Sequence, residues 1–153
     1  MAKFRQNVCV AVRKPGSDSL LLCHRKGFAP DKGWQFPQGG LHKGQDLESE
    51  MRRELREEIG TDAVRIIAIA PRKYTYSFPM GIKRRHGGYG GQTQQWVLAE
   101  LTVPEGEINF RHQPAEFDGF EWSSAEIVLD KIVDFKRTVY FEAMRDLGLF
   151  AKR

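Results

Sequence analysis

The pattern of apolar positions along the chain predicts short strands interrupted by two amphipathic helices. Four apolar runs have the length and composition of strands: residues 8–12, 20–23, 64–70 and 95–103. A strong turn signal, Lys14-Pro15-Gly16-Ser17-Asp18, separates the first two runs. Residues 34–37 form a short extended piece that Pro37 should end, because proline has no N–H to pair.

The first helix is predicted over residues 46–59. Its apolar members recur at a spacing of four and form one stripe that faces the core: Leu47, Met51, Leu55 and Ile59. Asp46 precedes the helix and can cap its first turn, and Gly60 is a typical stop. A second helix is predicted over residues 135–147, with Phe135, Val139, Ala143, Met144 and Leu147 inward.

The chain has 153 residues, 41% of them apolar and 11% aromatic. This length suits one α/β domain over residues 1–153 that buries about two-thirds of its unfolded surface. No apolar run approaches the roughly 18 residues needed to span a bilayer, and the N-terminus has no apolar signal core. Cys9 and Cys23 lie in strand-like runs, which indicates buried, reduced thiols and a cytoplasmic protein.

The formal net charge of +4 favours anionic partners without identifying one. The distribution of charge along the chain is more informative, because the first helix is rich in acidic residues while residues 83–86 and 136–137 are basic. An acidic site ringed by basic segments suits a metal ion together with a polyphosphate or a nucleic-acid end.

Three carboxylates on the first helix, Glu54, Glu57 and Glu58, are spaced i, i+3 and i+4. They share one helix face, where like charges repel unless a cation lies between them. A glycine loop, Gly39-Gly40, precedes this helix. Taken alone, the carboxylates would be solvated surface charge, with Arg53 and Glu57 forming an ordinary i,i+4 pair.

This segment resembles the box of the Nudix hydrolases. The matching positions are Gly39, Gln45, Arg53, Glu54, Glu57, Glu58 and Gly60. The chain departs from the box twice, with Gln45 where a glutamate is usual and Thr61 where an aliphatic residue is usual. Four further blocks are similar to the branch that contains bacterial RNA pyrophosphohydrolases and dinucleoside polyphosphate hydrolases: residues 34–40, 91–96, 116–122 and 133–137.

The resemblance implies an α/β/α sandwich around a mixed β-sheet and a site for Mg²⁺, for which Mn²⁺ can substitute. Glu54, Glu57 and Glu58 would be metal ligands and catalytic residues, with the carbonyl of Gly39 and the carboxylate of Glu116 beside them. Glu54 or Glu116 would act as the general base, and the sequence does not choose between them. Taken alone, Glu116 would be plain surface charge.

The resemblance also gives structural roles within the box. The residue at position 45 is expected to pair with Arg53 and to support the helix rather than bind metal. Glutamine can accept this hydrogen bond but loses the charge assistance, about a factor of two in strength. We therefore expect activity to survive the change at Gln45. Gly60 should end the helix.

Substrate contacts follow from the resemblance to the enzymes that act on RNA. Basic residues and a base-stacking pair match Arg5, Arg25, Phe135 and Lys136, while Gln92 and Gln94 would line the site. Phe135 could instead pack in the core and Lys136 could be solvated. Arg84 and Arg85 would contact the RNA backbone or simply solubilise a loop.

The predicted function is removal of pyrophosphate from 5′-triphosphorylated RNA to leave a 5′-monophosphate, a step of mRNA decay. The alternatives are hydrolysis of dinucleoside polyphosphates or nucleoside triphosphates, and a non-catalytic module that binds nucleotides or RNA ends. The retained Glu54, Glu57 and Glu58 argue against the last of these. A homodimer is a further expectation from the resemblance only.

Overall fold

The computed structural model describes residues 3–80 and 88–150. Its strands are β1 (Phe4–Arg13), β2 (Leu20–Arg25), β3 (Trp34–Gln35), β4 (Gln38–Gly40), β5 (Val64–Ile69), β6 (Tyr74–Ser77), β7 (Gly91–Leu101) and β8 (Phe117–Ser123). Its helices are α1 (Leu47–Ile59), α2 (Ala125–Lys131), α3 (Asp134–Asp146) and the short 3-10 turn η2 (Glu105–Glu107).

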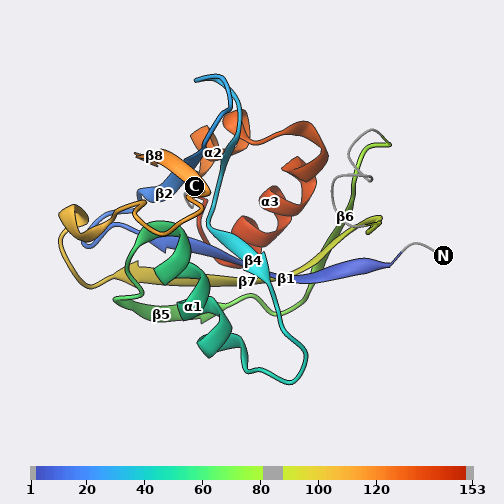
Figure 1. Ribbon diagram of the computed structural model, residues 1–153, viewed down its shortest axis with the longest axis horizontal. Helices are drawn as coiled ribbons and strands as arrows, with labels where there is room; N and C mark the ends of the chain where they lie inside the picture. The colour runs from blue at the N-terminus through green and yellow to red at the C-terminus, as the bar shows by residue number, and fades with distance from the viewer. Residues whose placement is uncertain (1–2, 81–87, 151–153) are drawn as a thin grey trace.

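The strands form one mixed sheet, as predicted (Figure 1). The order is β3-β2-β1-β7-β5, and β4, β6 and β8 pair with β1, β7 and β2 respectively. At the centre, β1 and β7 run parallel in an unbroken register from Phe4↔Gly91 to Arg13↔Glu100. The other pairings are antiparallel.

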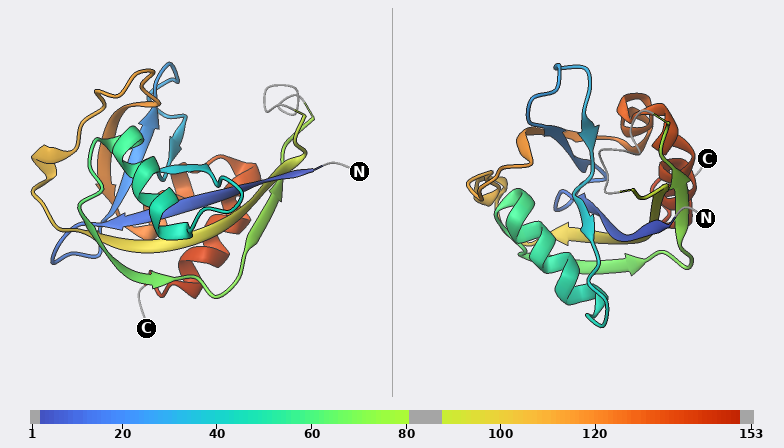
Figure 2. Two further views of the ribbon diagram at one scale, coloured as in Figure 1. Left: turned by 60° about the horizontal axis from the view of Figure 1, so that its bottom comes forward. Right: turned by 45° about the vertical axis from the view of Figure 1, so that its right-hand side comes forward.

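Helices cover both faces of this sheet, which explains why β1 is apolar at successive positions. Val8, Val10 and Val12 point to the core under α1, whereas Cys9 and Ala11 point to the core under α3. Figure 2 shows α1 on one side of the central strands and α3 on the other. The predicted α/β/α sandwich is therefore confirmed.

Helix α1 begins and ends where the sequence predicts. Asp46 accepts a hydrogen bond from the backbone N–H of Ser49 (3.0 Å), and Gly60 adopts a left-handed conformation with φ of 76°. Met51, Leu55 and Ile59 are fully buried. This stripe fixes the rotation of α1, so that Glu54, Glu57 and Glu58 all reach the neighbouring cavity.

The sequence patterns missed β4, β6, β8 and α2, and they placed the start of β7 four residues too late. Helix α3 was predicted within one residue at each end. Cys9 and Cys23 are buried and free, as expected. In the described part of the chain, each helix is too short or too polar to cross a membrane.

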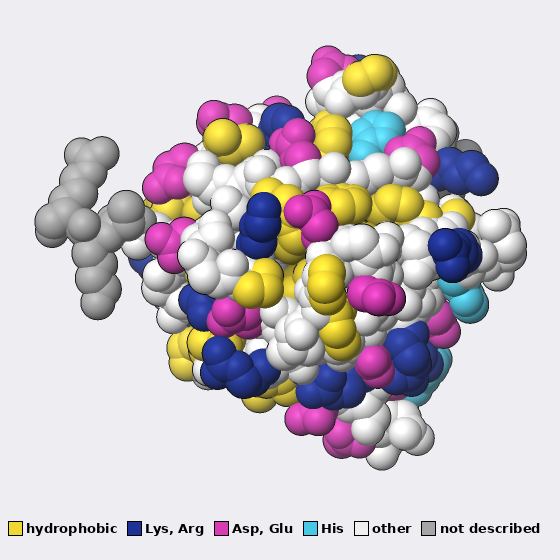
Figure 3. Space-filling view, turned by 90° about the vertical axis from the view of Figure 1, so that its left-hand side faces the viewer, with side chains coloured by type: hydrophobic (Ala, Val, Ile, Leu, Met, Phe, Trp, Pro, Cys, Tyr) yellow, Lys and Arg dark blue, Asp and Glu magenta, His cyan; other side chains and the backbone are white. Residues whose placement is uncertain are grey.

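Charges of both signs are interspersed on the face of the molecule seen in Figure 3. Exposed apolar side chains lie between them. The net positive charge of the chain is therefore not gathered into a basic patch on this face.

Candidate functional site

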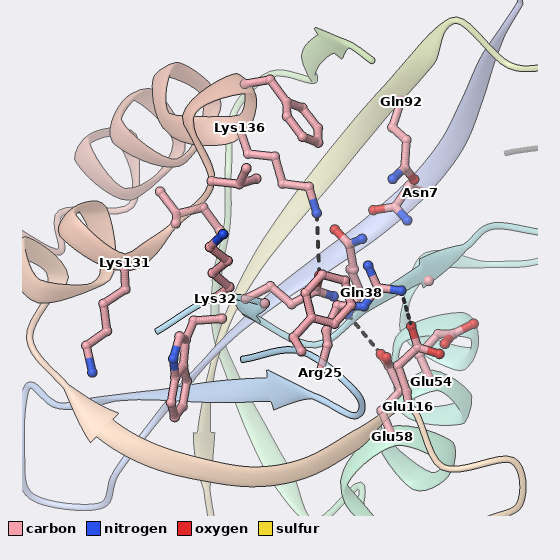
Figure 4. Close-up of a pocket in the computed structure, with 18 of the residues that line it drawn as sticks. Asn7, Arg25, Lys32, Gln38, Glu54, Glu58, Gln92, Glu116, Lys131 and Lys136 are labelled. Carbon is pink, nitrogen blue, oxygen red and sulfur yellow. Dashed lines mark hydrogen bonds and ion pairs between the residues drawn. The ribbon is translucent and has the colours of Figure 1, made fainter. Parts of the chain in front are cut away.

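A cavity of about 1080 Å³ opens beside α1, at the end of the sheet where β1 begins and β2 ends. Figure 4 shows Glu54, Glu58 and Glu116 gathered at one end of it, while Lys32 and Lys131 lie farther along towards α2. Lys136 and Gln92 lie across from the carboxylates. The cavity thus has an acidic end and a basic side.

Nearly all residues predicted to contact metal or substrate line this cavity: Arg5, Arg25, Gly39, Glu54, Glu57, Glu58, Gln92, Glu116, Phe135 and Lys136. Gln94 does not line it, because that side chain is fully buried. Its Nε2 donates to Asn7 Oδ1 (2.8 Å) and to Gln38 Oε1 (2.9 Å), so it supports the floor of the site instead. Arg84 and Arg85 lie outside the described residues.

Burial and mutual repulsion make the carboxylates at the acidic end hard to ionise. The pKa of Glu58 is raised well above its usual range by burial and by the nearby Glu54 and Glu116. Burial also raises the pKa of Glu54, although Arg53 opposes this shift. A cation held among these groups would relieve both effects.

The glycine loop lies directly against the charged groups. A Cβ added to Gly39 would lie 1.9 Å from Cδ of Glu54, and one added to Gly40 would lie 2.5 Å from Nη2 of Arg5. The backbone can approach the carboxylate and the guanidinium only because both residues lack a side chain.

The donor set fits a hard divalent cation. Glu54, Glu57 and Glu58 supply carboxylate oxygens from one helix face, and the strand at Gly39 brings bare backbone against them. Among the described residues, no three acidic, histidine or cysteine side chains already converge as ligands. Glu54 and Glu57 lie 3.0 and 3.3 Å from the guanidinium of Arg53, and Glu58 accepts from Gln38 N.

Three residues were expected to have structural roles in the motif. Gly60 ends helix α1 and Arg53 pairs with neighbouring carboxylates, but Gln45 does not contact Arg53. Arg53 contacts Glu50, Glu54 and Glu57, and its Nη2 also donates to the carbonyl of Gly40 (3.3 Å). The side chain of Gln45 is exposed and forms no hydrogen bond within the described part of the chain. The structure thus does not bring Gln45 and Arg53 together.

Lys136 is buried rather than solvated. Its side chain is 7% exposed, and burial lowers its pKa to about 8. Nζ lies 3.4 Å from Gln35 Oε1 and 5.9 Å from the ring centres of Tyr76 and Phe135. Phe135 both packs against the core and lines the cavity, so the two readings of this residue are compatible.

Arg25 has two partners in this structure. It lies over the ring of Phe28 (4.9 Å to the centroid) and forms an ion pair with Glu116 (3.7 Å). Arg25 and Phe135 line the same cavity.

Sequence reasoning missed a second aromatic-basic group, of which Trp34 and Lys131 line the cavity. Lys131 lies 4.8 Å from the ring centre of Trp34, and His24 packs on Trp34 at 5.0 Å. His24 is held in turn by Asp118 (2.7 Å) and by the carbonyl of Ala29 (2.9 Å). His24, Trp34 and Lys131 are far apart in the sequence, and no local motif connects them.

The fold is shared with proteins of known structure. The Escherichia coli dihydroneopterin triphosphate pyrophosphohydrolase superposes with a TM-score of 0.68 over 94% of this chain and 99% of that one, at 16% identity. This likeness shows that the two proteins share a fold.

The family follows from the sequence comparisons. The NUDIX domain matches residues 3–143. Nudix hydrolase 25 of Arabidopsis thaliana is 35% identical over 96% of this chain and 87% of its own length. The RNA pyrophosphohydrolase of Campylobacter jejuni is 38% identical over 93% and 91%. This chain therefore belongs to the Nudix family, whose hydrolases generally need divalent metal ions.

Proposed function

We propose that this chain is a Mg²⁺-dependent RNA pyrophosphohydrolase, which removes pyrophosphate from 5′-triphosphorylated RNA and leaves a 5′-monophosphate. The observation that carries the proposal is the layout of the cavity, in which a carboxylate cluster on α1 faces Arg5, Arg25, Lys136 and Phe135. At about 1080 Å³ the cavity lies at the upper end of the usual range for ligand sites, so it has room for more than one nucleotide. The relative from Campylobacter jejuni carries this activity in its name.

The carboxylates of α1 would hold the metal ion. Glu54, Glu57 and Glu58 supply the side-chain oxygens, with the carbonyl of Gly39 and the carboxylate of Glu116 close by. When bound, Mg²⁺ neutralises phosphate charge and lowers the pKa of a coordinated water. The raised pKa of Glu58 supports this assignment, because the protein concentrates acidic groups where burial alone disfavours them.

The basic side of the cavity would hold the phosphates and the first bases of the RNA. Arg5 lies against Gly40, and Lys136 projects from α3 beside the ring of Phe135. Stacking of a base on an aromatic face contributes about 1–3 kcal/mol and tolerates any base. Such contacts suit an enzyme that recognises an RNA end rather than an internal sequence.

Either Glu54 or Glu116 would take the proton from the attacking water. Glu54 is buried against the glycine loop, whereas Glu116 is paired with Arg25. Glu54→Gln and Glu116→Gln variants should therefore be compared by their pH–rate profiles. The variant that loses the acidic limb of the profile identifies the base.

The decisive experiment compares hydrolysis rates on triphosphorylated RNA, diadenosine tetraphosphate and GTP, each with Mg²⁺. We expect RNA to be turned over fastest, with release of pyrophosphate and a monophosphorylated RNA product. Equal or faster turnover of either small molecule would instead assign the dinucleoside polyphosphate or nucleoside triphosphate activity. Metal-dependent binding of all three without turnover would identify a non-catalytic module.

We further propose that residues 1–153 work as one domain in the cytoplasm. The two free, buried cysteines support a reducing environment. Sedimentation at several concentrations would test the expected homodimer.

A further inference from the structure

Glu50 is a buried carboxylate on α1 that the predicted site does not use. It is only 3% exposed and does not line the cavity. A charge buried this deeply needs hydrogen-bonding partners, and Glu50 has them on both oxygens. Oε1 accepts from the backbone N–H of His42 (2.7 Å) and lies 2.9 Å from His42 Nδ1, while Oε2 accepts from Nε of Arg53 (2.8 Å).

The surroundings of Glu50 favour its ionised form. Burial opposes its ionisation, but the hydrogen bonds from His42 N and Arg53 outweigh burial and lower its pKa. The bond to Arg53 is therefore assisted by charge at both ends, which roughly doubles its strength.

Arg53 connects Glu50 to the predicted metal ligands. Glu50 occupies the Nε side of the guanidinium, and the Nη groups remain for Glu54 (3.0 Å) and Glu57 (3.3 Å). Nη2 also donates to the carbonyl of Gly40, next to Gly39. Because the guanidinium is planar and rigid, fixing one edge fixes the directions of the other donors.

Gln45 stands where a glutamate paired with this arginine is expected, yet its side chain is exposed and forms no hydrogen bond among the described residues. Glu50 makes the expected contact instead, and from the helix rather than from the loop. We infer that Glu50 has taken over the role of the missing glutamate: it is the positioning residue that orients Arg53, and through Arg53 the carboxylates of Glu54 and Glu57.

The inference rests on the proposed metal site, so its test includes a measurement that needs no substrate. The variant Glu50→Ala is made in the natural chain and together with Gln45→Glu, and Mn²⁺ affinity is measured by paramagnetic resonance titration. Glu48→Ala is the matched control, because Glu48 lies on the same helix and pairs with Arg52 (3.2 Å) at the surface. Loss of a group that orients a ligand typically weakens metal binding about 10–100-fold.

We expect Glu50→Ala to weaken Mn²⁺ binding at least about tenfold and to lower kcat by a similar factor, with KM for RNA little changed. In the double variant, Gln45→Glu should restore most of the lost Mn²⁺ affinity and kcat. In the natural chain, Gln45→Glu should change these two quantities by less than about threefold, because Glu50 already occupies Nε of Arg53. Glu48→Ala should leave all three quantities unchanged.

A purely structural role for Glu50 predicts a different result. Tying α1 to His42 would then matter only for stability, and Glu50→Ala would lower the unfolding temperature while Mn²⁺ affinity stayed normal. That outcome overturns the inference, as does a double variant that Gln45→Glu fails to restore. If Glu50→Ala does not fold, Glu50→Gln gives the same test, because the amide keeps the size of the side chain but can accept from only one of His42 N and Arg53 Nε.

Failure of the proposed function would be visible separately. The natural chain would then hydrolyse none of the three substrates, yet Glu50→Ala would still lose Mn²⁺ affinity and the double variant would recover it. This result supports the positioning role of Glu50 and contradicts the proposed activity on RNA.

Discussion

Glu57 is the most exposed of the three carboxylates that α1 presents to the cavity. Its side chain is 38% exposed, against 11% for Glu54, and it forms an i,i+4 pair with Arg53. Such a pair stabilises a helix by only a few tenths of a kcal/mol, so stability alone does not explain three acids on one face. A measurement of activity therefore tests whether Glu57 takes part in catalysis.

We expect Glu57→Gln to lower turnover at least about a hundredfold, because it removes charge that the site holds against a metal ion. The measurement is kcat on triphosphorylated RNA, with the unfolding temperature recorded alongside. Glu48→Gln is the control, since Glu48 forms a similar i,i+4 pair with Arg52 outside the cavity. Near-normal turnover in Glu57→Gln would remove this residue from the site.

Lys136 should give the enzyme a pH dependence of substrate binding. Burial lowers its pKa from 10.5 to about 8, so the side chain loses its charge as the pH rises through 8. We expect KM for RNA to increase above pH 8 in the natural chain. In Lys136→Met, KM should be higher and should not vary with pH across this range, and identical profiles for the two proteins would contradict the assignment.

The same shift in the pKa of Lys136 makes the stability of the fold depend on pH. Between pH 8 and 10.5 the unfolded chain keeps the proton on Lys136 and the folded chain does not. The folded state therefore binds fewer protons, and the free energy of unfolding gained from this group rises with pH through that window. Substrate binding and stability thus respond to Lys136 in opposite directions.

At the scale of elements, α1 connects the core to the site, and its first turn depends on Asp46. We expect Asp46→Ala to lower the free energy of unfolding by about 1 kcal/mol, because Ser49 N loses its hydrogen-bond acceptor. Chemical denaturation is the measurement. Asp46→Asn should restore the stability, since asparagine caps helices about as well, and an equal loss in both variants would rule out capping as the cause.

The elements that the sequence predicted are those with a strong apolar period. The helix α1 was predicted with both ends because Asp46, the stripe through Met51 and Leu55, and Gly60 all agree. By contrast, β4 contains only Gln38, Gly39 and Gly40 and has no apolar pattern. Its strand conformation comes from pairing with β1, a tertiary contact that no local pattern contains.

The residues of the site, like the helices and strands, were predicted where a local sequence pattern indicates them and missed where a tertiary contact decides. The carboxylates of α1 follow from a motif with fixed spacing. The partner of Arg53 did not follow, because Glu50 and Gln45 both lie near Arg53 in the sequence and only the fold shows that Glu50 makes the contact. Gln92 and Gln94 share a face of β7, but Asn7 and Gln38 cover only Gln94, which their spacing in the sequence cannot show.

Across the whole molecule, the position of the positive charges determines how a site that contains acidic groups can bind a polyanion. The net charge is only +4, and the face in Figure 3 carries a mixture of both signs. Several cations instead line the cavity itself: Arg5, Arg25, Lys32, Lys131 and Lys136. Arg25 and Lys131 are paired with Glu116 and Glu121, whereas the other three form no ion pair with any described residue.

Three unpaired cations set a definite salt dependence for RNA binding. Each phosphate contact on a single strand contributes about 0.7 to the slope of log affinity against log salt, so three contacts predict a slope of about −2. We expect Lys32→Gln to reduce its magnitude by about 0.7. Lys14→Gln should not change it, because Lys14 pairs with Glu105 outside the cavity. Titration of labelled RNA at fixed Mg²⁺, in the Glu57→Gln variant so that the RNA is not consumed, measures these slopes. Equal slopes in the two lysine variants would mean that the RNA is held elsewhere on the surface and that the cavity receives only its triphosphate end.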